Sequence, residues 1–163
     1  MHENKKQKIV TDVFNILTKH RLSIATAESC TAGYLSFLLT QMPGSSAFYH
    51  YGMIVYSNES KINLLAIPDE LIDSFGAVSA EAAEAMAINI RRVLKTDIGL
   101  SITGIAGPDG GSATKPVGTV YLGLDLLGKV YYKKYNFLES DRNTLRIISA
   151  YSALEFLLQQ LSQ

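Results

Sequence analysis

A serine and a cysteine stand side by side in the run ATAESCTAG, at the point where a small, apolar segment gives way to a helical pattern. Apolar residues recur at helical spacing from Tyr34 onward, so Ser29, Cys30 and Thr31 are expected at the start of a helix. Unpaired N–H groups and the helix dipole stabilise an anion there, whether an alkoxide, an acyl oxyanion or a phosphate. The alternative is that Ser29 and Thr31 only cap the helix.

A tyrosine and a lysine follow the second apolar segment, in the run YSNESK. Tyr56 and Lys61 are spaced Y-x-x-x-x-K, whereas short-chain dehydrogenases use Y-x-x-x-K on one helix, and no G-x-x-x-G-x-G dinucleotide turn follows the first strand. This pattern argues against a hydride-transfer enzyme. Serine hydrolases that lack a histidine base commonly use lysine, which desolvation or neighbouring cations can keep neutral.

The third apolar segment runs into a glycine-rich loop, GIAGPDGG at residues 104–111. It is not a P-loop, because no G-K-[ST] follows. Its glycines let backbone N–H groups approach a ligand closely. The alternative is a flexible connection made of turn residues.

Arg142 stands in the first turn of the last predicted helix, where a cation opposes the helix dipole. An anion held between Arg142 and the helix N-terminus would explain this placement. The alternative is that Arg142 extends to Glu139 or to solvent. Serine, lysine, tyrosine, backbone donors and arginine together indicate acyl transfer on a ligand that carries a phosphate.

Periodicity, glycines and prolines divide the chain into the elements that position these residues. Three strand–helix units followed by a hairpin and a helix predict an α/β fold, a three-layer α/β/α sandwich with a mixed sheet. Ligands bind such a sheet beyond the carboxyl ends of its parallel strands, where all three runs fall. The expected helices are 6–20, a second that begins at residues 29–31 and ends near 42, 58–65 with Asn58 as N-cap, 68–75, 80–95 with Ser79 as N-cap, and 141–160; the expected strands are 22–27, 51–57, 98–103, 119–126 and 129–137.

Composition indicates one globular domain, residues 1–163. Hydrophobic residues make up 47% and the formal net charge is zero, which argues against a nucleic-acid partner. With no apolar run of membrane-spanning length and no signal peptide, we expect no membrane association and a cytoplasmic protein. A single cysteine and three scattered histidines predict neither disulfide nor metal site. Homo-oligomer formation is left open.

Five motifs, AESCTAG, YSNESK, GAVS, SITGIAGPDGG and KPVGTVY, closely resemble in order and spacing the CinA C-terminal domain family. The resemblance covers about residues 6–160. Stand-alone members of the family are nicotinamide-nucleotide amidases. It implies hydrolysis of the carboxamide of nicotinamide mononucleotide to nicotinic acid mononucleotide and ammonia, a step of pyridine-nucleotide salvage that needs no cofactor or metal. The N-terminal domain of full-length CinA proteins is expected to be absent, together with its separate hydrolase activity.

The resemblance also implies a role for each motif residue. A thiol is intrinsically the better attacker, so Cys30 is a rival nucleophile. The second function considered is a non-catalytic nucleotide-binding or competence- and damage-associated module, which would not need a lysine beside a serine. The implied roles are Ser29 as nucleophile, Lys61 and Tyr56 as its activating pair, Cys30, Thr31, Thr103, Gly104 and Gly107 as substrate-binding residues, and Arg142 near the phosphate.

The first motif departs from the family at one position. It usually ends Thr-Gly-Gly, whereas this chain has Thr31-Ala32-Gly33. The extra methyl group of Ala32 is expected to crowd the backbone near the substrate.

Overall fold

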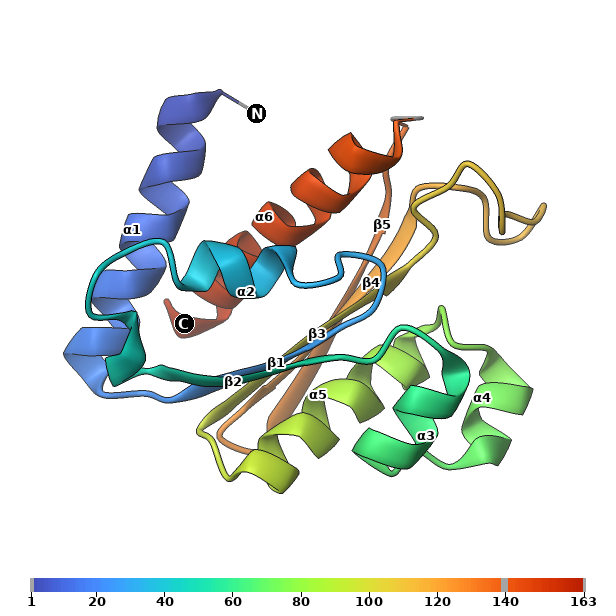
Figure 1. Ribbon diagram of the computed structural model, residues 1–163, viewed down its shortest axis with the longest axis horizontal. Coiled ribbons are helices and arrows are strands. Elements are labelled where there is room, and N and C mark those ends of the chain that lie inside the picture. Colours follow the sequence, from blue (N-terminus) through green and yellow to red (C-terminus); the bar gives the residue numbers. More distant parts are fainter. Residues whose placement is uncertain (1, 139–140, 163) are drawn as a thin grey trace.

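A computed structural model describes residues 2–138 and 141–162 as three layers, with a five-stranded mixed sheet between two groups of helices (Figure 1). The strand order is β2-β1-β3-β4-β5, and β2, β1 and β3 are parallel whereas β4 and β5 run antiparallel. The elements are α1 (Glu3–His20), β1 (Ile24–Glu28), α2 (Tyr34–Leu39), η1 (Ser45–Ala47), β2 (Tyr49–Ile54), α3 (Asn58–Leu65), α4 (Asp69–Phe75), α5 (Ala80–Leu94), β3 (Ile98–Gly104), β4 (Thr119–Leu126), β5 (Lys129–Asn136) and α6 (Arg142–Leu161). The predicted sandwich with a mixed sheet is confirmed.

Each face of the sheet has its own apolar cluster. The helices α1, α2 and α6 cover one face, and α3, α4 and α5 cover the other (Figure 1). Because β1 is covered on both sides, all of its residues are buried, and its side chains alternate between the two clusters. This alternation sends Glu28 towards α2 and the next residue, Ser29, towards α3.

The alanine-rich α5 packs unusually close to the sheet. A Cβ atom at Gly99 would lie 2.0 Å from the Ala87 carbonyl oxygen, and one at Gly123 would lie 2.1 Å from that of Ala83. Glycine is therefore required at both positions, because any larger residue would push α5 off the sheet. As predicted, Ser79 caps this helix by accepting a hydrogen bond from the Ala82 N–H.

Most differences from the expected elements lie at their ends. The second strand ends at Ile54 rather than residue 57, and Ser57 rather than Asn58 is the N-cap of α3. The helix predicted to begin at residues 29–31 and to end near 42 is shorter, beginning at Tyr34 and ending at Leu39. The hairpin that joins β4 to β5 turns at Leu127 and Gly128, both with positive φ, as the sequence predicts.

Candidate active site

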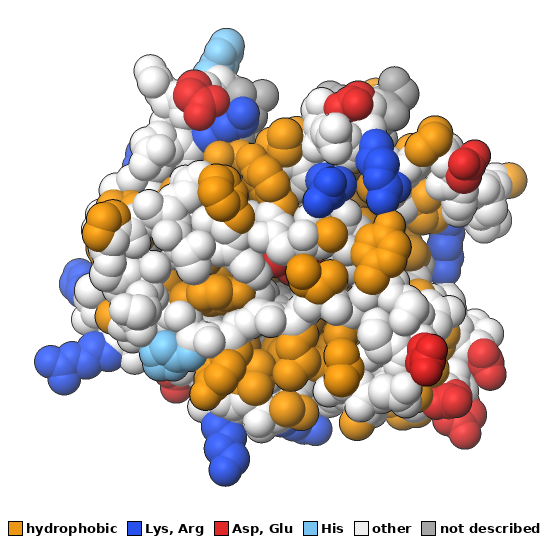
Figure 2. All heavy atoms as spheres, viewed as in Figure 1, with side chains coloured by type: hydrophobic (Ala, Val, Ile, Leu, Met, Phe, Trp, Pro, Cys, Tyr) orange, Lys and Arg blue, Asp and Glu red, His pale blue; other side chains and the backbone are white. Residues whose placement is uncertain are grey.

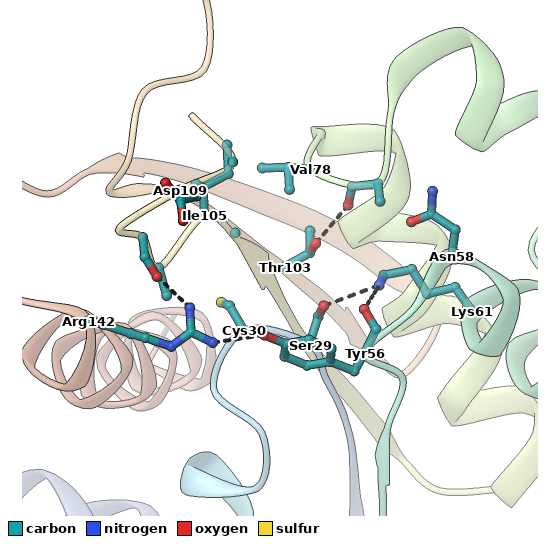
Figure 3. A pocket seen from close by; sticks show the side chains of 15 residues that line it. Ser29, Cys30, Tyr56, Asn58, Lys61, Val78, Thr103, Ile105, Asp109 and Arg142 are labelled. Carbon is teal, nitrogen blue, oxygen red and sulfur yellow. Dashed lines mark hydrogen bonds between the residues drawn. The ribbon is translucent and has the colours of Figure 1, made fainter. Parts of the chain in front are cut away.

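A pocket of about 270 Å³ opens at the carboxyl ends of the three parallel strands. The three runs singled out in the sequence meet there, as expected for a sheet of this kind. Figure 3 shows side chains from all three converging on this space, joined by Arg142 from the start of α6. The lining residues are Ser29, Cys30, Tyr56, Asn58, Lys61, Ala77, Val78, Thr103, Gly104, Ile105, Ala106, Gly107, Asp109, Gly110 and Arg142.

Ser29 and Lys61 are in contact inside this pocket. The Lys61 Nζ atom donates a hydrogen bond of 3.1 Å to Ser29 Oγ, across 32 residues of sequence. Only 7% of Ser29 and 1% of Lys61 is exposed, so water has little access to the contact. The hydroxyl and the amine therefore stand in the geometry of a nucleophile and its base.

The surroundings of Lys61 are neutral. Its other hydrogen bonds go to backbone carbonyls at the end of β2 and the start of α3, at 2.8 Å to Val55, 3.3 Å to Tyr56 and 3.4 Å to Ser57. In the part of the chain that the structure describes, no carboxylate forms an ion pair with it. Burial lowers the pKa of Lys61 below its ordinary value of 10.5, because the ammonium form loses hydration there.

Ser29 is held in place by the residue before it. Glu28 is completely buried, and its carboxylate accepts hydrogen bonds from the N–H groups of Gly33 and Leu35, both at 3.0 Å. Ser36 donates both its N–H, at 2.8 Å, and its hydroxyl, at 2.6 Å. The carboxylate thereby closes residues 29–33 into a tight turn that directs Ser29 at Lys61.

Comparison with known proteins places this chain in a family. The family model for the CinA C-terminal domain matches residues 6–161. The chain belongs to the CinA C-terminal domain family. A CinA-like protein of Dictyoglomus thermophilum is 44% identical over 155 residues, which are 95% of this chain and 37% of that protein. A CinA-like protein of Geobacter sp. (strain M21) is 46% identical over 142 residues, covering 87% of this chain and 34% of the relative.

Solved structures show the same fold over their whole length. Competence damage-inducible protein A (ComA) of Klebsiella pneumoniae superposes with a TM-score of 0.93 at 30% identity, covering 97% of this chain and 98% of that one. The competence/damage inducible protein CihA of Agrobacterium tumefaciens gives a TM-score of 0.92 at 34% identity, covering 97% and 96%. This chain spans about a third of the length of the two curated CinA-like relatives described above.

In this CinA domain, α2 starts later than the sequence predicts, and its first N–H groups are already used. The helix begins at Tyr34, so Ser29, Cys30 and Thr31 lie in the turn before it rather than in its first turn. The Glu28 carboxylate accepts hydrogen bonds from the N–H groups at the helix start, so the anion bound there is the protein's own carboxylate. The N–H groups of Gly33, Leu35 and Ser36 are therefore not available to a substrate anion.

Two residues of the turn lie outside the pocket. Thr31 is completely buried, and its hydroxyl donates to Glu28 at 2.7 Å while its carbonyl accepts from Arg146. Its side chain braces the turn and does not reach the pocket, against the substrate-binding role implied for it. Ala32 is exposed, so its methyl group does not crowd the substrate. With φ +47°, however, this residue adopts the left-handed backbone conformation, which is unfavourable for alanine.

Cys30 lines the pocket next to Ser29 but is poorly suited to attack. Burial raises the pKa of its thiol to about 12, since the thiolate would lose its hydration. Nucleophilic attack by cysteine requires the thiolate, which is scarce near neutral pH when the pKa is so high. The geometry and this pKa both favour Ser29.

The Tyr56 hydroxyl is bonded to Arg142 rather than to Lys61. Arg142 donates to the Tyr56 hydroxyl at 2.8 Å and to the Gly107 carbonyl oxygen (Figure 3). Lys61 contacts only the backbone carbonyl of Tyr56. The lysine and the phenol therefore do not form a hydrogen-bonded pair, and Arg142 connects the loop after β2 to the glycine-rich loop.

The start of α6 carries its own anion. Asp141 is the N-cap, and its carboxylate accepts a hydrogen bond of 2.7 Å from the Thr144 N–H. The hydrogen bonds from Thr144 hold the pKa of Asp141 below its usual range. Asp141 thus supplies the negative charge that the helix dipole favours beside Arg142. Glu139, the alternative partner considered for Arg142, lies outside the described residues.

Sequence reasoning found five of the six implied binding residues in the pocket and missed others. Cys30, Thr103, Gly104, Gly107 and Arg142 line it. Asn58 and Asp109 also line it but were not predicted as site residues, although both lie within motifs quoted above. The role of Glu28 was missed as well; a carboxylate directly before Ser29 was the available signal. Among residues 2–138 and 141–162, no three His, Cys, Asp or Glu side chains gather as metal ligands would.

One further finding concerns the helices. In the same part of the chain, none is both long and apolar enough to cross a membrane.

Proposed function

We propose that this CinA domain is a serine amidase that hydrolyses the carboxamide of nicotinamide mononucleotide to nicotinic acid mononucleotide and ammonia. The observation that supports it most is the buried 3.1 Å contact between Lys61 Nζ and Ser29 Oγ. A binding module would gain nothing from burying a lysine without a carboxylate beside a serine, because that arrangement costs stability. The proposed compartment is the cytoplasm, where a free thiol such as Cys30 persists.

In the proposed reaction, neutral Lys61 accepts the Ser29 hydroxyl proton as Oγ attacks the carboxamide carbon. The Val55 and Tyr56 carbonyls accept the two N–H groups of the neutral amine, which leaves its lone pair for the serine proton. Collapse of the tetrahedral intermediate breaks the C–N bond, and Lys61 returns the proton to the leaving ammonia. Water then attacks the acyl-serine ester with Lys61 again as base, and releases the carboxylate.

The developing oxyanion needs donors at the attacking serine. The Ser29 N–H donates to the Ile102 carbonyl oxygen, so it is already used. The N–H groups of Cys30 and Thr31 donate to no other residue in the described part of the chain. The N–H of the residue after the nucleophile is a common oxyanion donor, and we assign that role to Cys30.

We assign the substrate phosphate to Arg142. Two of its five N–H donors are used by Tyr56 and Gly107, which leaves others for a phosphate oxygen. It lines the same pocket as Ser29, so one ligand can contact both. Tyr56 then acts by holding this guanidinium rather than by activating Ser29.

Ammonia release from nicotinamide mononucleotide by the purified protein tests the proposed function. We expect Ser29→Ala to lose about three or more orders of magnitude in turnover, the scale for an essential nucleophile. The matched control is Cys30→Ala, which should keep most activity. No ammonia release from the wild type would favour the non-catalytic module, and the reverse pattern between the two variants would make Cys30 the nucleophile.

The phosphate assignment has its own test, in which nicotinamide riboside serves as the substrate without phosphate. Arg142→Ala should cost about ten- to hundredfold in catalytic efficiency on the mononucleotide, the range for a charged hydrogen bond. It should have little effect on the riboside. Equal loss on both substrates would instead place the phosphate on the loop from Gly104 to Gly111.

A further inference from the structure

Thirty consecutive residues, 29–58, contain no Lys, Arg, Asp or Glu, although the whole chain has 15 basic and 15 acidic residues. This segment contains α2, η1 and β2, and β2 is the first strand of the sheet order. The uncharged stretch thus includes the whole of the strand at this edge of the sheet. Depletion of charge is the compositional mark of the centre of a protein–protein interface.

Large apolar side chains are exposed along this edge. Phe37 on α2 is 54% exposed, and Tyr51 and Ile54 on β2 are 49% and 53% exposed. Figure 2 shows hydrophobic side chains gathered on this face, with most charged side chains towards its margin. We call Phe37, His50, Tyr51, Gly52 and Ile54 the β2 edge surface.

The backbone of β2 has hydrogen-bonding groups without partners. In the described residues β2 pairs only with β1, and the Val55 N–H that follows the strand donates to Glu28. Because backbone groups alternate along a strand, the N–H and C=O groups of His50, Gly52 and Ile54 point away from β1. An exposed edge of this kind is a template for pairing with another strand.

The opposite edge of the sheet is protected against such pairing. There β5 carries Lys129, Lys133 and Lys134, and lysine on an edge strand discourages association. Its exposed Tyr132, at 55%, is comparable to Tyr51 on β2. The two edges therefore differ in charge rather than in the exposure of aromatic side chains.

We propose that the β2 edge surface binds a second copy of this chain, through antiparallel pairing of the two β2 strands about a two-fold axis. With Gly52 on the axis, His50 of one copy lies opposite Ile54 of the other, and the outward backbone groups pair with their own equivalents. An uncharged surface meets itself without like-charge repulsion, whereas a partner selected by charge finds no counter-charge here. This interface does not depend on the proposed amidase activity.

The test is the mass of the native protein in solution, by light scattering and sedimentation equilibrium. We expect a dimer of about 36 kDa, twice the chain mass of 17.8 kDa. Ile54→Lys and Tyr51→Lys should each weaken dimerisation by about tenfold or more, since each buries a charge in an interface whose segment, residues 29–58, offers no acidic partner. The matched control on the other edge, Tyr132→Lys, should remain as dimeric as the wild type.

Disulfide trapping checks the register with a variant that keeps the edge uncharged. Residues directly opposite each other in such a pair have Cα atoms about 5.5 Å apart, within the range for a disulfide. His50→Cys combined with Ile54→Cys should give a covalent dimer on mild oxidation, whereas Lys129→Cys combined with Lys133→Cys on β5 should not. A wild type that is monomeric up to about 100 μM would overturn the proposal and leave the edge to a different chain. A dimer that Tyr132→Lys disrupts and Ile54→Lys does not would overturn it as well.

Discussion

Two cations on the same side of the sheet are accommodated in different ways. Arg91 on α5 pairs its Nε with the buried Asp125 carboxylate on β4 at 2.7 Å. Lys61, at the opposite end of the sheet, is more deeply buried yet faces only carbonyl oxygens and the Ser29 hydroxyl. A carboxylate partner holds a cation in its charged form, whereas a buried amine without one can lose its proton. The difference separates a structural cation from a group suited to proton transfer.

Removing the Lys61 amine should have the largest effect. Lys61→Met keeps most of the side-chain volume and removes the proposed base, so turnover of nicotinamide mononucleotide should fall by about three orders of magnitude or more. The protein should stay folded, because a buried amine without a counter-charge does not favour the folded state. Steady-state ammonia release and thermal unfolding measure the two effects. Near-normal turnover in this variant would remove lysine from the mechanism.

Arg91→Met should give the reverse pattern. It leaves the Asp125 carboxylate buried without its cation, which costs about 3–5 kcal/mol in fully buried pairs. Because about a quarter of the Arg91 side chain is exposed, we expect a loss of about 2–3 kcal/mol in the free energy of unfolding. Urea unfolding measures it. Turnover at a temperature where the variant is folded should match the wild type, and a loss of turnover without a loss of stability would break the contrast between the two cations.

The pH dependence should separate the two cations further. Proton acceptance requires neutral Lys61, so turnover should rise with pH through its lowered pKa and then level off. In the unfolded chain Lys61 keeps its proton up to about pH 10.5, its ordinary pKa. The free energy of unfolding therefore rises with pH between the lowered pKa of the folded protein and that value. The stability advantage of Lys61→Met over the wild type should then be largest below this pH window and smallest above it. A constant difference in unfolding free energy across the pH range would contradict the assignment.

The sequence predicts the place of this site better than its internal contacts. Apolar segments ending in ESCT, YSNESK and TGIAGPDGG were enough to bring three loops to one rim, because parallel strands share their carboxyl edge. The predicted ends of several helices lie close to the observed ones because serine, proline and glycine mark helix ends locally, as Ser79 and Gly76 do.

The direction of individual side chains was not predictable in the same way. Ala32 and Gly33 both have positive φ, and this reversal sends Thr31 into the core instead of the pocket. The bond between Arg142 and the Tyr56 hydroxyl joins residues 86 apart in sequence. Such contacts depend on how the loops pack in three dimensions, and no local pattern records them.

The smallest expected effect concerns the turn that aims Ser29 at Lys61. Ala32 has φ +47°, a conformation that costs a non-glycine residue about 1–2 kcal/mol, whereas glycine adds about 0.4–1 kcal/mol of unfolded-state entropy. Ala32→Gly should therefore stabilise the protein by about 0.5–1 kcal/mol, measured by urea unfolding, without changing kcat or KM. Ala66, exposed with φ +51°, offers a matched control that should gain as much, whereas Ala47, which lacks a positive φ, should lose stability on the same change. If Ala32→Gly lost stability as Ala47→Gly does, the turn would hold Ser29 without backbone cost, and Glu28 alone would explain its position.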